Sequence, residues 1–376
     1  MNPIQILSEL VAINSVSARS NAEIVDYLAQ QCEALGFTVK RFPYRDDNGV
    51  EKTNLIALAG ADFSSKRQVE LALVGHTDTV PFAATWLEAT TLTEKDGKLY
   101  GRGACDTKSF IACALKAAAL TDLSKLRRPL ALIFTADEEI GLVGAKRLAA
   151  ASPITVRYSI VGEPTSLQPI RAGKGYCLAE VIVHGREGHS AYPALGTSAI
   201  VRAARLITRI EKIASELQQE QHPDFDPPFT TINVGLIRGG TAKNVIPGEC
   251  RLTLEWRPIP RQKSERVLKL IEGAITEEGK LDPDFSCDVN ASRTDSGFEV
   301  DGASDFVKLM ERLTGQASGT VAFGTEAAQL MQLGAEAVVL GPGNIRVAHR
   351  TGEFVPINEL ARCVEILTAA IKERCL

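Results

Sequence analysis

The residues of this chain that bear most directly on chemistry are a histidine and an aspartate at the end of an apolar segment. Residues 73–80 read Leu-Val-Gly-His-Thr-Asp-Thr-Val, so His76 ends an apolar run that begins near Val69, and Asp78 follows two residues later. A buried strand that delivers an imidazole at its end, with a carboxylate nearby to orient the ring, is a common way to build a metal site. A single His-x-Asp pattern is weak evidence, so the other polar segments decide its meaning.

Further segments place a metal ligand beside the end of an expected strand. They are Gly-Arg-Gly-Ala-Cys-Asp-Thr-Lys at 101–108, Asp-Glu-Glu at 137–139, Gly-Glu-Pro-Thr at 162–165 and Ala-His-Arg at 348–350. Two divalent ions that share a bridging carboxylate need about five protein ligands, and zinc accepts histidine nitrogen and carboxylate oxygen. The candidate ligands are His76, Asp106, Glu139, Glu163 and His349.

Each candidate also has a purely structural interpretation. His76 could be a buried histidine bonded to the backbone, and Asp106 could cap the helix expected directly after it. Glu138 and Glu139 could be solvated loop charges, and Glu163 could be a turn residue before a proline. Their common position after apolar strands favours one shared site over five independent explanations.

The histidine count narrows the choice of ligands further. The chain has five histidines. His184 ends an expected strand and His222 lies in the polar, proline-rich loop 218–228, and neither has a carboxylate motif beside it. We therefore interpret these two as structural or solvated residues.

Composition limits the class of protein. A length of 376 residues predicts two domains, and 45% apolar with 23% charged residues is typical of a globular protein. The formal net charge of −4 gives no basic surface for nucleic acid and no polybasic membrane signal. The start of the chain has no cationic region followed by an apolar stretch, and the eight cysteines contain no Cys-x-x-Cys. A cytoplasmic enzyme with reduced thiols, and without membrane or nucleic-acid partners, is the expectation.

The order of elements predicts an α/β domain in the first part of the chain. Apolar runs alternate with segments of helical periodicity, which favours a mostly parallel sheet with ligands at the carboxyl ends of its strands. We expect helices at 4–13, 22–35 and 107–120, and strands at 37–41, 54–59, 69–74, 130–135 and 157–161.

The pattern changes after about residue 171. Strands are expected at 176–183, 230–237, 249–256 and 285–289, and helices at 197–217 and 264–275. This β-α-β-β-α-β order is that of a ferredoxin-like domain. The α/β pattern then returns, with helices at 307–313, 325–333 and 356–372 and a strand at 336–340. We predict a catalytic domain built from 1–171 and 291–376, interrupted by a domain at 172–290.

Once these segments are taken together, the chain resembles the M20 metallopeptidase family over essentially its whole length, and within that family the acetylornithine deacetylases. The motifs that carry the resemblance are 75–81, 101–106, 135–139, 162–165, 185–190 and 341–343. Cys105, directly before Asp106, and the Gly-Thr-Glu-Ala segment at 324–327 resemble that branch most. The resemblance implies a zinc-exopeptidase-like catalytic domain, with the inserted domain acting as a lid that pairs two subunits.

The resemblance also implies a ligand set. Two zinc ions, which cobalt can replace, would be held in one site. His76, Asp106 and Glu163 would hold the first ion, and Asp106 would bridge to the second. Glu139 and His349 would complete the second ion's ligands.

Further roles are implied for residues around the ions. Glu138 would be the general base and would return its proton to the leaving amine. Asp78 would orient His76. His189, on the inserted domain, would help to stabilise the oxyanion, and its structural interpretation is a loop histidine. The residues implied to contact the substrate are Asn244 and Arg257 at its carboxylate, Gly324 where the backbone approaches it, and Glu326 at its cationic side chain.

The implied reaction is hydrolysis of N2-acetyl-L-ornithine to acetate and L-ornithine, a step of arginine biosynthesis. In the family, aminoacylase-type members carry Glu at position 163 and several aminopeptidases carry Asp, so Glu163 favours an N-acylated amino acid as substrate. Alternatives are a succinyl-diaminopimelate desuccinylase and a broader N-acyl-L-amino-acid amidohydrolase. A binding protein without activity is disfavoured because the base and all five ligands are present. A homodimer formed through the lid domain is expected.

Overall fold

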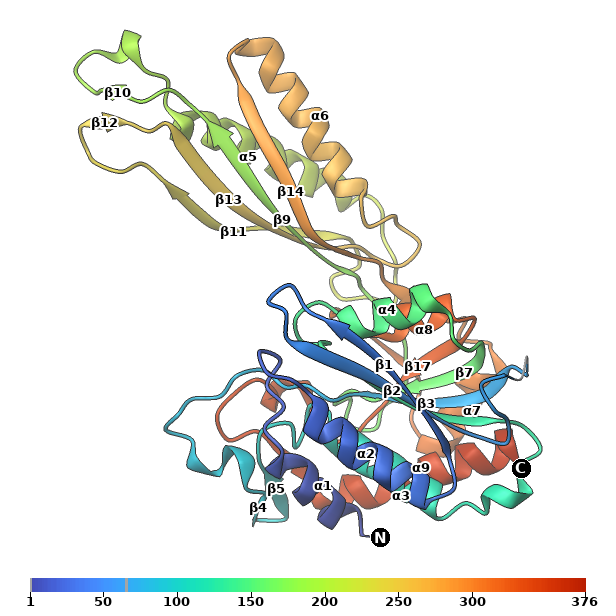
Figure 1. Ribbon diagram of the computed structural model, residues 1–376. Helices are drawn as coiled ribbons and strands as arrows, with labels where there is room; N and C mark the ends of the chain where they lie inside the picture. The colour runs from blue at the N-terminus through green and yellow to red at the C-terminus, as the bar shows by residue number, and fades with distance from the viewer. Residues whose placement is uncertain (1, 65–66) are drawn as a thin grey trace. The chain divides into compact units, whose positions relative to one another are not determined.

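The computed structural model describes residues 2–64 and 67–376, which form two units (Figure 1). The first unit comprises Met1–Arg171, Val300–Gly319 and Thr325–Leu376. The second comprises Ala172–Glu299 and Thr320–Gly324. The first unit is therefore interrupted and then completed along the chain, and the segment 172–290 lies within the second.

The first unit is built on a mixed sheet with a parallel centre. Four neighbouring strands run parallel in the order β6 (Leu130–Thr135), β3 (Val69–His76), β7 (Val156–Val161) and β17 (Glu336–Val339). Their Val-, Ile- and Leu-rich sequences are buried on both faces, as parallel strands covered by helices require. The antiparallel flanks are β1 (Thr38–Arg45) and β2 (Glu51–Ala59) on one side and β8 (Ile170–Gly173), which begins in this unit, on the other. Strand β8 also pairs with β15 (Phe298–Glu299), which belongs to the second unit, and with β16 (Gly319–Val321).

Helices cover both faces of this sheet (Figure 1). One face packs against α1 (Pro3–Ala12), α2 (Ala22–Ala34), α3 (Lys108–Ala119), α7 (Asp305–Thr314) and α9 (Ile357–Cys375), whose apolar side chains share one core with the strands. The other face carries α4 (Val143–Ala151) and α8 (Ala327–Gln332). Helix α3 is buried almost along its whole length, which explains its Ala-rich, apolar sequence.

A small sheet joins two distant parts of the first unit. Strand β5 (Lys98–Tyr100) pairs with β4 (Thr93–Lys95) on one side and with β18 (Phe354–Pro356) on the other. These strands of three residues are too short for a periodicity to reveal, and the sequence did not predict them. Short 3₁₀ helices lie at Leu87–Thr90, Leu123–Lys125, Pro193–Leu195 and Ile345–Val347.

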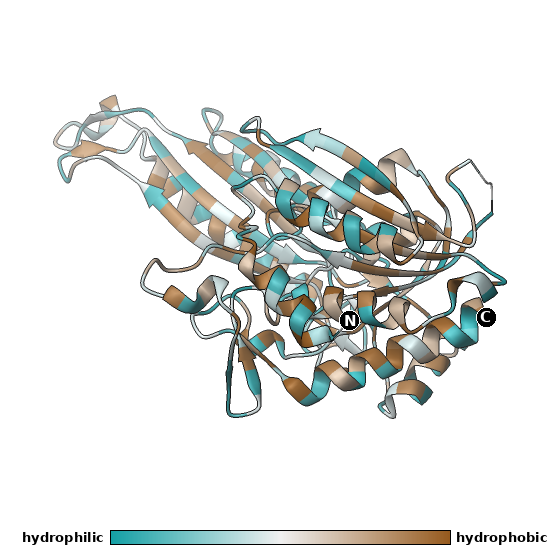
Figure 2. Cartoon of the chain, turned by 60° about the horizontal axis from the view of Figure 1, so that its bottom comes forward, coloured by the Kyte–Doolittle hydropathy of each residue, from teal (hydrophilic) through white to brown (hydrophobic). Residues whose placement is uncertain are grey.

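The second unit is a four-stranded antiparallel sheet with two helices. Its elements follow the chain as β9 (Tyr176–His184), α5 (Ala199–Leu217), β11 (Thr231–Gly239), β13 (Glu249–Arg257), α6 (Arg266–Leu281) and β14 (Ser286–Asp295). The strand order is β11-β13-β9-β14. Hydrophobic and hydrophilic residues alternate along these strands (Figure 2), and the apolar side packs against both helices. A two-stranded ladder, β10 (Gly188–His189) with β12 (Val245–Ile246), extends from this unit.

The fold class is thus confirmed: a mostly parallel α/β unit and a separate antiparallel unit with the β-α-β-β-α-β order. Some element bounds differ from the prediction. Helix α8 begins at Ala327, two residues later than expected, and α4 was not predicted at all. Helix α4 contains Gly144, where an added Cβ would lie 2.3 Å from the carbonyl oxygen of Ala136. A glycine therefore allows close packing at this position. In the described part of the chain, no helix is long and apolar enough to cross a membrane.

Candidate metal centre

The centre of the candidate site lies at the carboxyl end of β3. His76 is the last residue of this strand, pairs in register with Thr135 of β6, and is 1% exposed. Its Nδ1 lies 3.0 Å from the main-chain oxygen of Asp78, and its Nε2 lies 3.1 Å from Oδ1 of Asp106. The bond at Nδ1 fixes the ring and leaves Nε2 directed at the carboxylate cluster.

Asp106 joins two histidines that lie far apart in the sequence. It stands just before α3, and its two carboxylate oxygens face different rings: Oδ1 faces His76, and Oδ2 lies 3.2 Å from Nε2 of His349. The same His349 nitrogen lies 3.0 Å from Oε2 of Glu139. His76, Asp106 and Glu139 place one ligand atom each within 4.8 Å of one another. A carboxylate whose two oxygens serve separate ligand groups has the geometry that a bridge between two cations needs.

Asp78 contributes to the site mainly through the loop after β6. Its carboxylate accepts the main-chain N–H groups of Glu138 at 3.1 Å and Glu139 at 3.3 Å, and the hydroxyl of Ser17 donates to it at 2.7 Å. Its Oδ1 is 3.7 Å from Nδ1 of His76, which bonds to the carbonyl oxygen instead. The Asp78 side chain therefore positions the 138–139 loop, whereas its main chain orients the histidine.

The loop with Glu138 and Glu139 is held by a second buried contact. Asp137 has a φ of +56°, which is unusual for a residue with a side chain. Its carboxylate lies 2.8 Å from Nζ of the buried Lys52 and accepts the hydroxyl of Tyr44 at 2.8 Å. The sequence analysis missed both partners because β1 and β2 carry no motif that points to this loop.

The cluster concentrates negative charge, which favours the binding of cations. Burial raises the pKa of Glu138 and Glu163 well above the ordinary value, and neighbouring carboxylates add to this rise. Burial alone would lower the pKa of His76, but its bond to Asp106 and the surrounding carboxylates hold it well above the ordinary value. The bonds from His349 to Asp106 and Glu139 raise the pKa of that imidazole to about 10. Excess negative charge is confined here with oxygen and imidazole donors, so the residues fit divalent metal ions.

Two further carboxylates lie in the same unit. Glu163 follows β7, is 5% exposed, and is close enough to Asp106 and Glu138 to feel their charges. Glu326 directly precedes α8 and is 1% exposed. Its Oε1 meets no described residue at full hydrogen-bond geometry, but the Thr135 side chain is close enough to lower the pKa of this carboxyl. Burial raises the pKa of Glu326 to about 7, against the opposing effect of His76.

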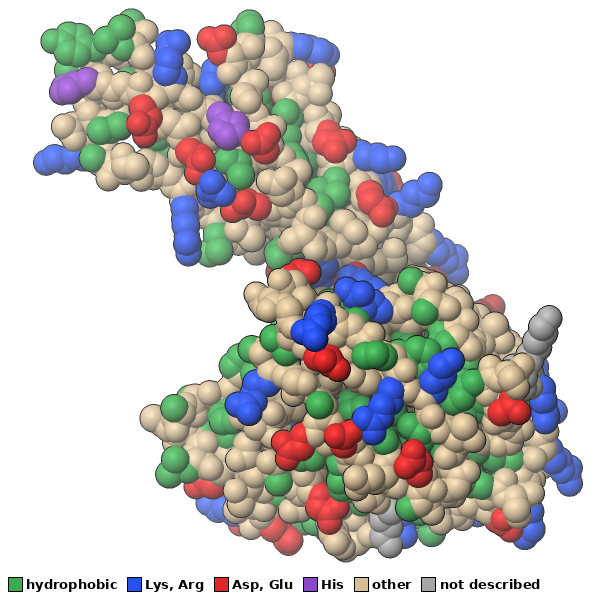
Figure 3. Space-filling view, in the orientation of Figure 1, with side chains coloured by type: hydrophobic (Ala, Val, Ile, Leu, Met, Phe, Trp, Pro, Cys, Tyr) green, Lys and Arg blue, Asp and Glu red, His purple; other side chains and the backbone are tan. Residues whose placement is uncertain are grey.

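His189 and Asn244 lie together in the second unit, on the two-stranded ladder. His189 pairs with Val245, and the N–H of Ser190 donates to the main-chain oxygen of Asn244 at 3.1 Å. Both side chains are exposed, and Nδ1 of His189 accepts the N–H of Ala191 at 3.1 Å. Histidine is visible on the surface of this unit (Figure 3).

Arg257 and Gly324 lie at another place in the second unit. The Arg257 guanidinium stacks 3.9 Å from the ring centre of Tyr176 and bonds to Glu255 at 2.7 Å. A Cβ added at Gly324 would lie 3.4 Å from that tyrosine. Arg257 ends β13, whereas Asn244 precedes its start, and eight steps of about 3.4 Å make the strand roughly 27 Å long. Asn244 and Arg257 of one chain are therefore too far apart to hold the same carboxylate.

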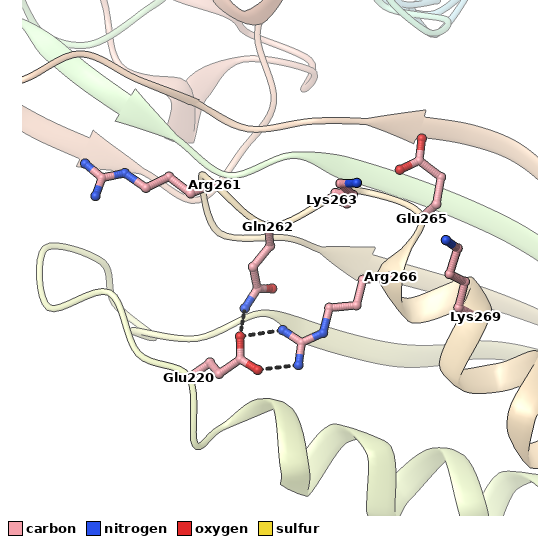
Figure 4. Close-up of a pocket in the computed structure, with 7 residues that line it drawn as sticks. All are labelled: Glu220, Arg261, Gln262, Lys263, Glu265, Arg266 and Lys269. Atoms are coloured by element: carbon pink, nitrogen blue, oxygen red, sulfur yellow. Dashed lines mark hydrogen bonds and ion pairs between the residues drawn. The ribbon is translucent and has the colours of Figure 1, made fainter.

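The other two histidines of the second unit each lie beside a carboxylate. His184 lies 2.7 Å from Asp288 and His222 lies 2.9 Å from Glu299, in agreement with structural roles. A cavity of about 560 Å³ is lined by Glu220, Arg261, Gln262, Lys263, Glu265, Arg266 and Lys269 (Figure 4). In it Glu220 forms a two-pronged ion pair with Arg266 and accepts a bond from Gln262. None of the predicted site residues lines this cavity.

Known proteins resemble the chain in sequence over almost its full length. The profile of peptidase family M20/M25/M40 matches residues 72–373. An acetylornithine deacetylase of Myxococcus xanthus is 52% identical over 370 residues, covering 98% of this chain and 96% of the relative. An acetylornithine deacetylase of Proteus mirabilis is 35% identical, covering 99% of this chain and 97% of the relative.

Solved structures share the fold. A tripeptidase of Staphylococcus aureus superimposes with a TM-score of 0.81 at 23% identity, covering 99% of this chain and 97% of that one. A metallo-carboxypeptidase of the M20 family from Sulfolobus solfataricus gives a TM-score of 0.77 at 18% identity, covering 99% of both chains. At these identities the likeness concerns the fold alone.

Proposed function

Because the chain belongs to peptidase family M20/M25/M40, we propose that it hydrolyses the N-acetyl amide of N2-acetyl-L-ornithine to acetate and L-ornithine. The observation that carries this proposal is the identity of 52% to an acetylornithine deacetylase across 98% of the chain. Identity at this level, without large gaps in either protein, supports the same reaction and not only the same fold. The reaction belongs to the biosynthesis of arginine, and a cytoplasmic location suits it.

The proposed cofactor is a pair of zinc ions, for which cobalt can substitute. His76, Asp106 and Glu163 would hold one ion, and Asp106, Glu139 and His349 the other. The two oxygens of Asp106 face different histidines, which supports a bridging role for this residue. Bound ions would act as Lewis acids and lower the pKa of the attacking water.

Glu138 is the proposed general base. It neighbours the proposed ligand Glu139, and Asp78 accepts the main-chain N–H groups of both residues, so the backbone that carries the two side chains is held in place. Burial and nearby carboxylates raise the pKa of Glu138, which favours proton uptake from water and proton return to the leaving amine.

The acylated substrate would be recognised at both of its charged ends. Arg257 is the proposed partner of its carboxylate, since an Arg fork matches two oxygens. Gly324, which also lies by Tyr176, would let the protein backbone approach the substrate. Glu326 is the proposed partner of the cationic side chain. The burial of its carboxylate supports this role, because a buried charge is costly unless an opposite charge pairs with it.

The bound ions would stabilise part of the oxyanion charge that develops in the reaction. The rest of this stabilisation is assigned to His189, supplied by a second copy of the chain. His189 and Asn244 lie together and are exposed, so both can contact another molecule. Strand β11 lies at the edge of its sheet and exposes Leu236 and Ile237, which favours pairing of two second units into a homodimer. Asn244 would then act beside His189 at the active site of the neighbouring chain. Arg257, at the other end of β13, would contact the substrate carboxylate separately from these two residues.

A substrate panel tests this function. Purified enzyme with added zinc or cobalt is offered N2-acetyl-L-ornithine, N-succinyl-L,L-diaminopimelate and several other N-acetyl-L-amino acids, and kcat/KM is measured for each. The highest value is expected for acetylornithine. A preference for the succinyl substrate would indicate a desuccinylase, and equal values throughout would indicate a broad amidohydrolase.

A further inference from the structure

A buried carboxylate outside the ligand set connects two segments of the metal centre. Glu353 is 0% exposed and lies four residues after His349. Its Oε1 accepts two main-chain N–H groups, that of Cys105 at 2.9 Å and that of Asp106 at 3.0 Å. The Glu353 side chain thus holds the backbone of the proposed bridging ligand directly.

The other oxygen of this carboxylate has an equally specific partner. Oε2 of Glu353 accepts a bond from Nη1 of Arg102 at 2.6 Å, and that arginine is 4% exposed. The guanidinium also lies 5.3 Å from the ring centre of Trp86. Each oxygen of Glu353 therefore receives N–H donors alone, and the charge of the carboxylate is balanced inside the protein.

The main chain around Glu353 reinforces the same link. Its carbonyl oxygen accepts the N–H of Gly101 at 3.1 Å, and the next residues form β18, which pairs with β5. Residues 353–356, shortly after His349, are thus joined to the segment 98–106 that ends in Asp106. These contacts of Glu353 therefore help to fix the distance between the proposed ligands Asp106 and His349.

We propose that Glu353 is a positioning residue of the metal centre, which holds Asp106 and His349 at the separation that a metal ion between them requires. The inference rests on the ligand set proposed above. Glu353 does not touch the ions or the substrate in this account. It acts through the orientation of Asp106 and through the chain segment that carries His349.

The substitution Glu353→Gln tests this role with almost no change in shape. A glutamine amide has one oxygen and one NH₂ group, so in either orientation its NH₂ faces a donor: the N–H pair of the Asp106 loop or the Arg102 guanidinium. We expect a 10- to 100-fold loss of zinc affinity, about the range for partners that orient metal ligands. Glu353→Asp keeps the charge with a shorter reach and is expected to retain more affinity than Glu353→Gln.

A matched control separates positioning from general stability. Glu70 is also a buried carboxylate of the first unit with arginine partners, Arg128 at 3.1 Å and Arg157 at 3.5 Å. It lies near the opposite end of β3 from His76, roughly 20 Å away at about 3.3 Å per residue. Glu70→Gln is expected to lower the melting temperature of the metal-free protein without changing its zinc affinity.

The measurement is competition of metal-free protein with a chelator for Zn²⁺, together with thermal unfolding of each metal-free variant. A selective loss of zinc affinity in Glu353→Gln, with Glu70→Gln unchanged, supports the proposal. Equal zinc affinity in wild type and Glu353→Gln would overturn it, as would an equal loss in both variants. Failure of the wild type itself to bind zinc would refute the metal centre instead, so the two failures are distinguishable.

Discussion

The metal centre and the His189 ladder are held in place in opposite ways. In the first unit His76, Asp106 and Glu139 each have a second contact that fixes them, through Asp78 or Glu353. On the ladder, His189 and Asn244 are exposed and held by a few main-chain bonds. His76 and Asp106 are buried and meet Glu139 and the exposed His349 within one chain, whereas the role proposed for His189 requires a second copy of the chain.

The sharpest division within the buried cluster is between Glu138 and Glu139. Glu138→Gln is expected to lower kcat about 10²- to 10⁴-fold and to keep the metal content, because it removes a base that transfers a proton. Glu139→Gln is expected to lower the metal content as well, because it removes a ligand. Metal analysis of both purified variants beside their kinetics measures this. Equal metal loss in the two variants would contradict the separate roles.

Substitution of His189 on the ladder is predicted to lower the reaction rate without changing the zinc affinity. His189→Ala should lower kcat about 10²- to 10³-fold, as loss of one oxyanion donor does, with unchanged zinc affinity. Loss of zinc together with activity would break the distinction between the two regions.

Mixing inactive variants tests whether His189 serves a neighbouring chain. We expect His189→Ala and Glu138→Gln subunits, refolded together, to regain activity, because one site of the mixed dimer then has both an intact base and a donated histidine. Each variant refolded alone is the control. Confirmed mixed dimers without activity, or a monomer at assay concentrations, would rule out the shared site.

Arg257 offers a smaller effect, on binding. Arg257→Ala should raise KM for acetylornithine about 10- to 100-fold, since a charge-assisted hydrogen bond contributes about 1.5–3 kcal/mol. The same variant should discriminate less between the acid substrate and its amide. An unchanged KM, or a wild type that prefers the amide, would argue against the carboxylate contact.

Glu326 is expected to show the smallest effect. Glu326→Gln should reduce the preference for acetylornithine over an uncharged acetyl-amino acid of similar length by about tenfold, because one charge-assisted bond is weakened. The ratio of the two kcat/KM values measures this preference. A uniform loss on both substrates would assign Glu326 to the structure of the site instead.

The sequence allows some features of the fold and the site to be predicted, but not others. Strand ends could be predicted because buried parallel strands read as continuous apolar runs. Of the proposed ligands, His76 ends such a run and Glu139 follows another, and Asp106, just before the expected helix, lies with them in the structure. The contacts that fix these residues in place could not be predicted from the sequence. Glu353 bonds to Asp106 across 247 positions, and no spacing in the sequence announces a contact of that kind.

Other details also depended on the folded chain. The sequence assigned the Asp78 carboxylate to His76. In the structure the Asp78 carbonyl makes the shorter contact with that ring, and the carboxylate also holds the 138–139 loop. Asn244 and Arg257 share an inserted domain and a proposed ligand, yet β13 separates them along its length. Residue type predicted what each group could bind, and only the sheet register showed which groups can act together.

The most direct test of the account is the activity of metal-free enzyme as zinc is added back. The rate of acetate and ornithine release from N2-acetyl-L-ornithine is measured against equivalents of Zn²⁺ per chain. The account predicts almost no activity without metal and a rise that reaches its plateau at two equivalents. Full activity of the metal-free enzyme, or no release of ornithine at any zinc level, would contradict it.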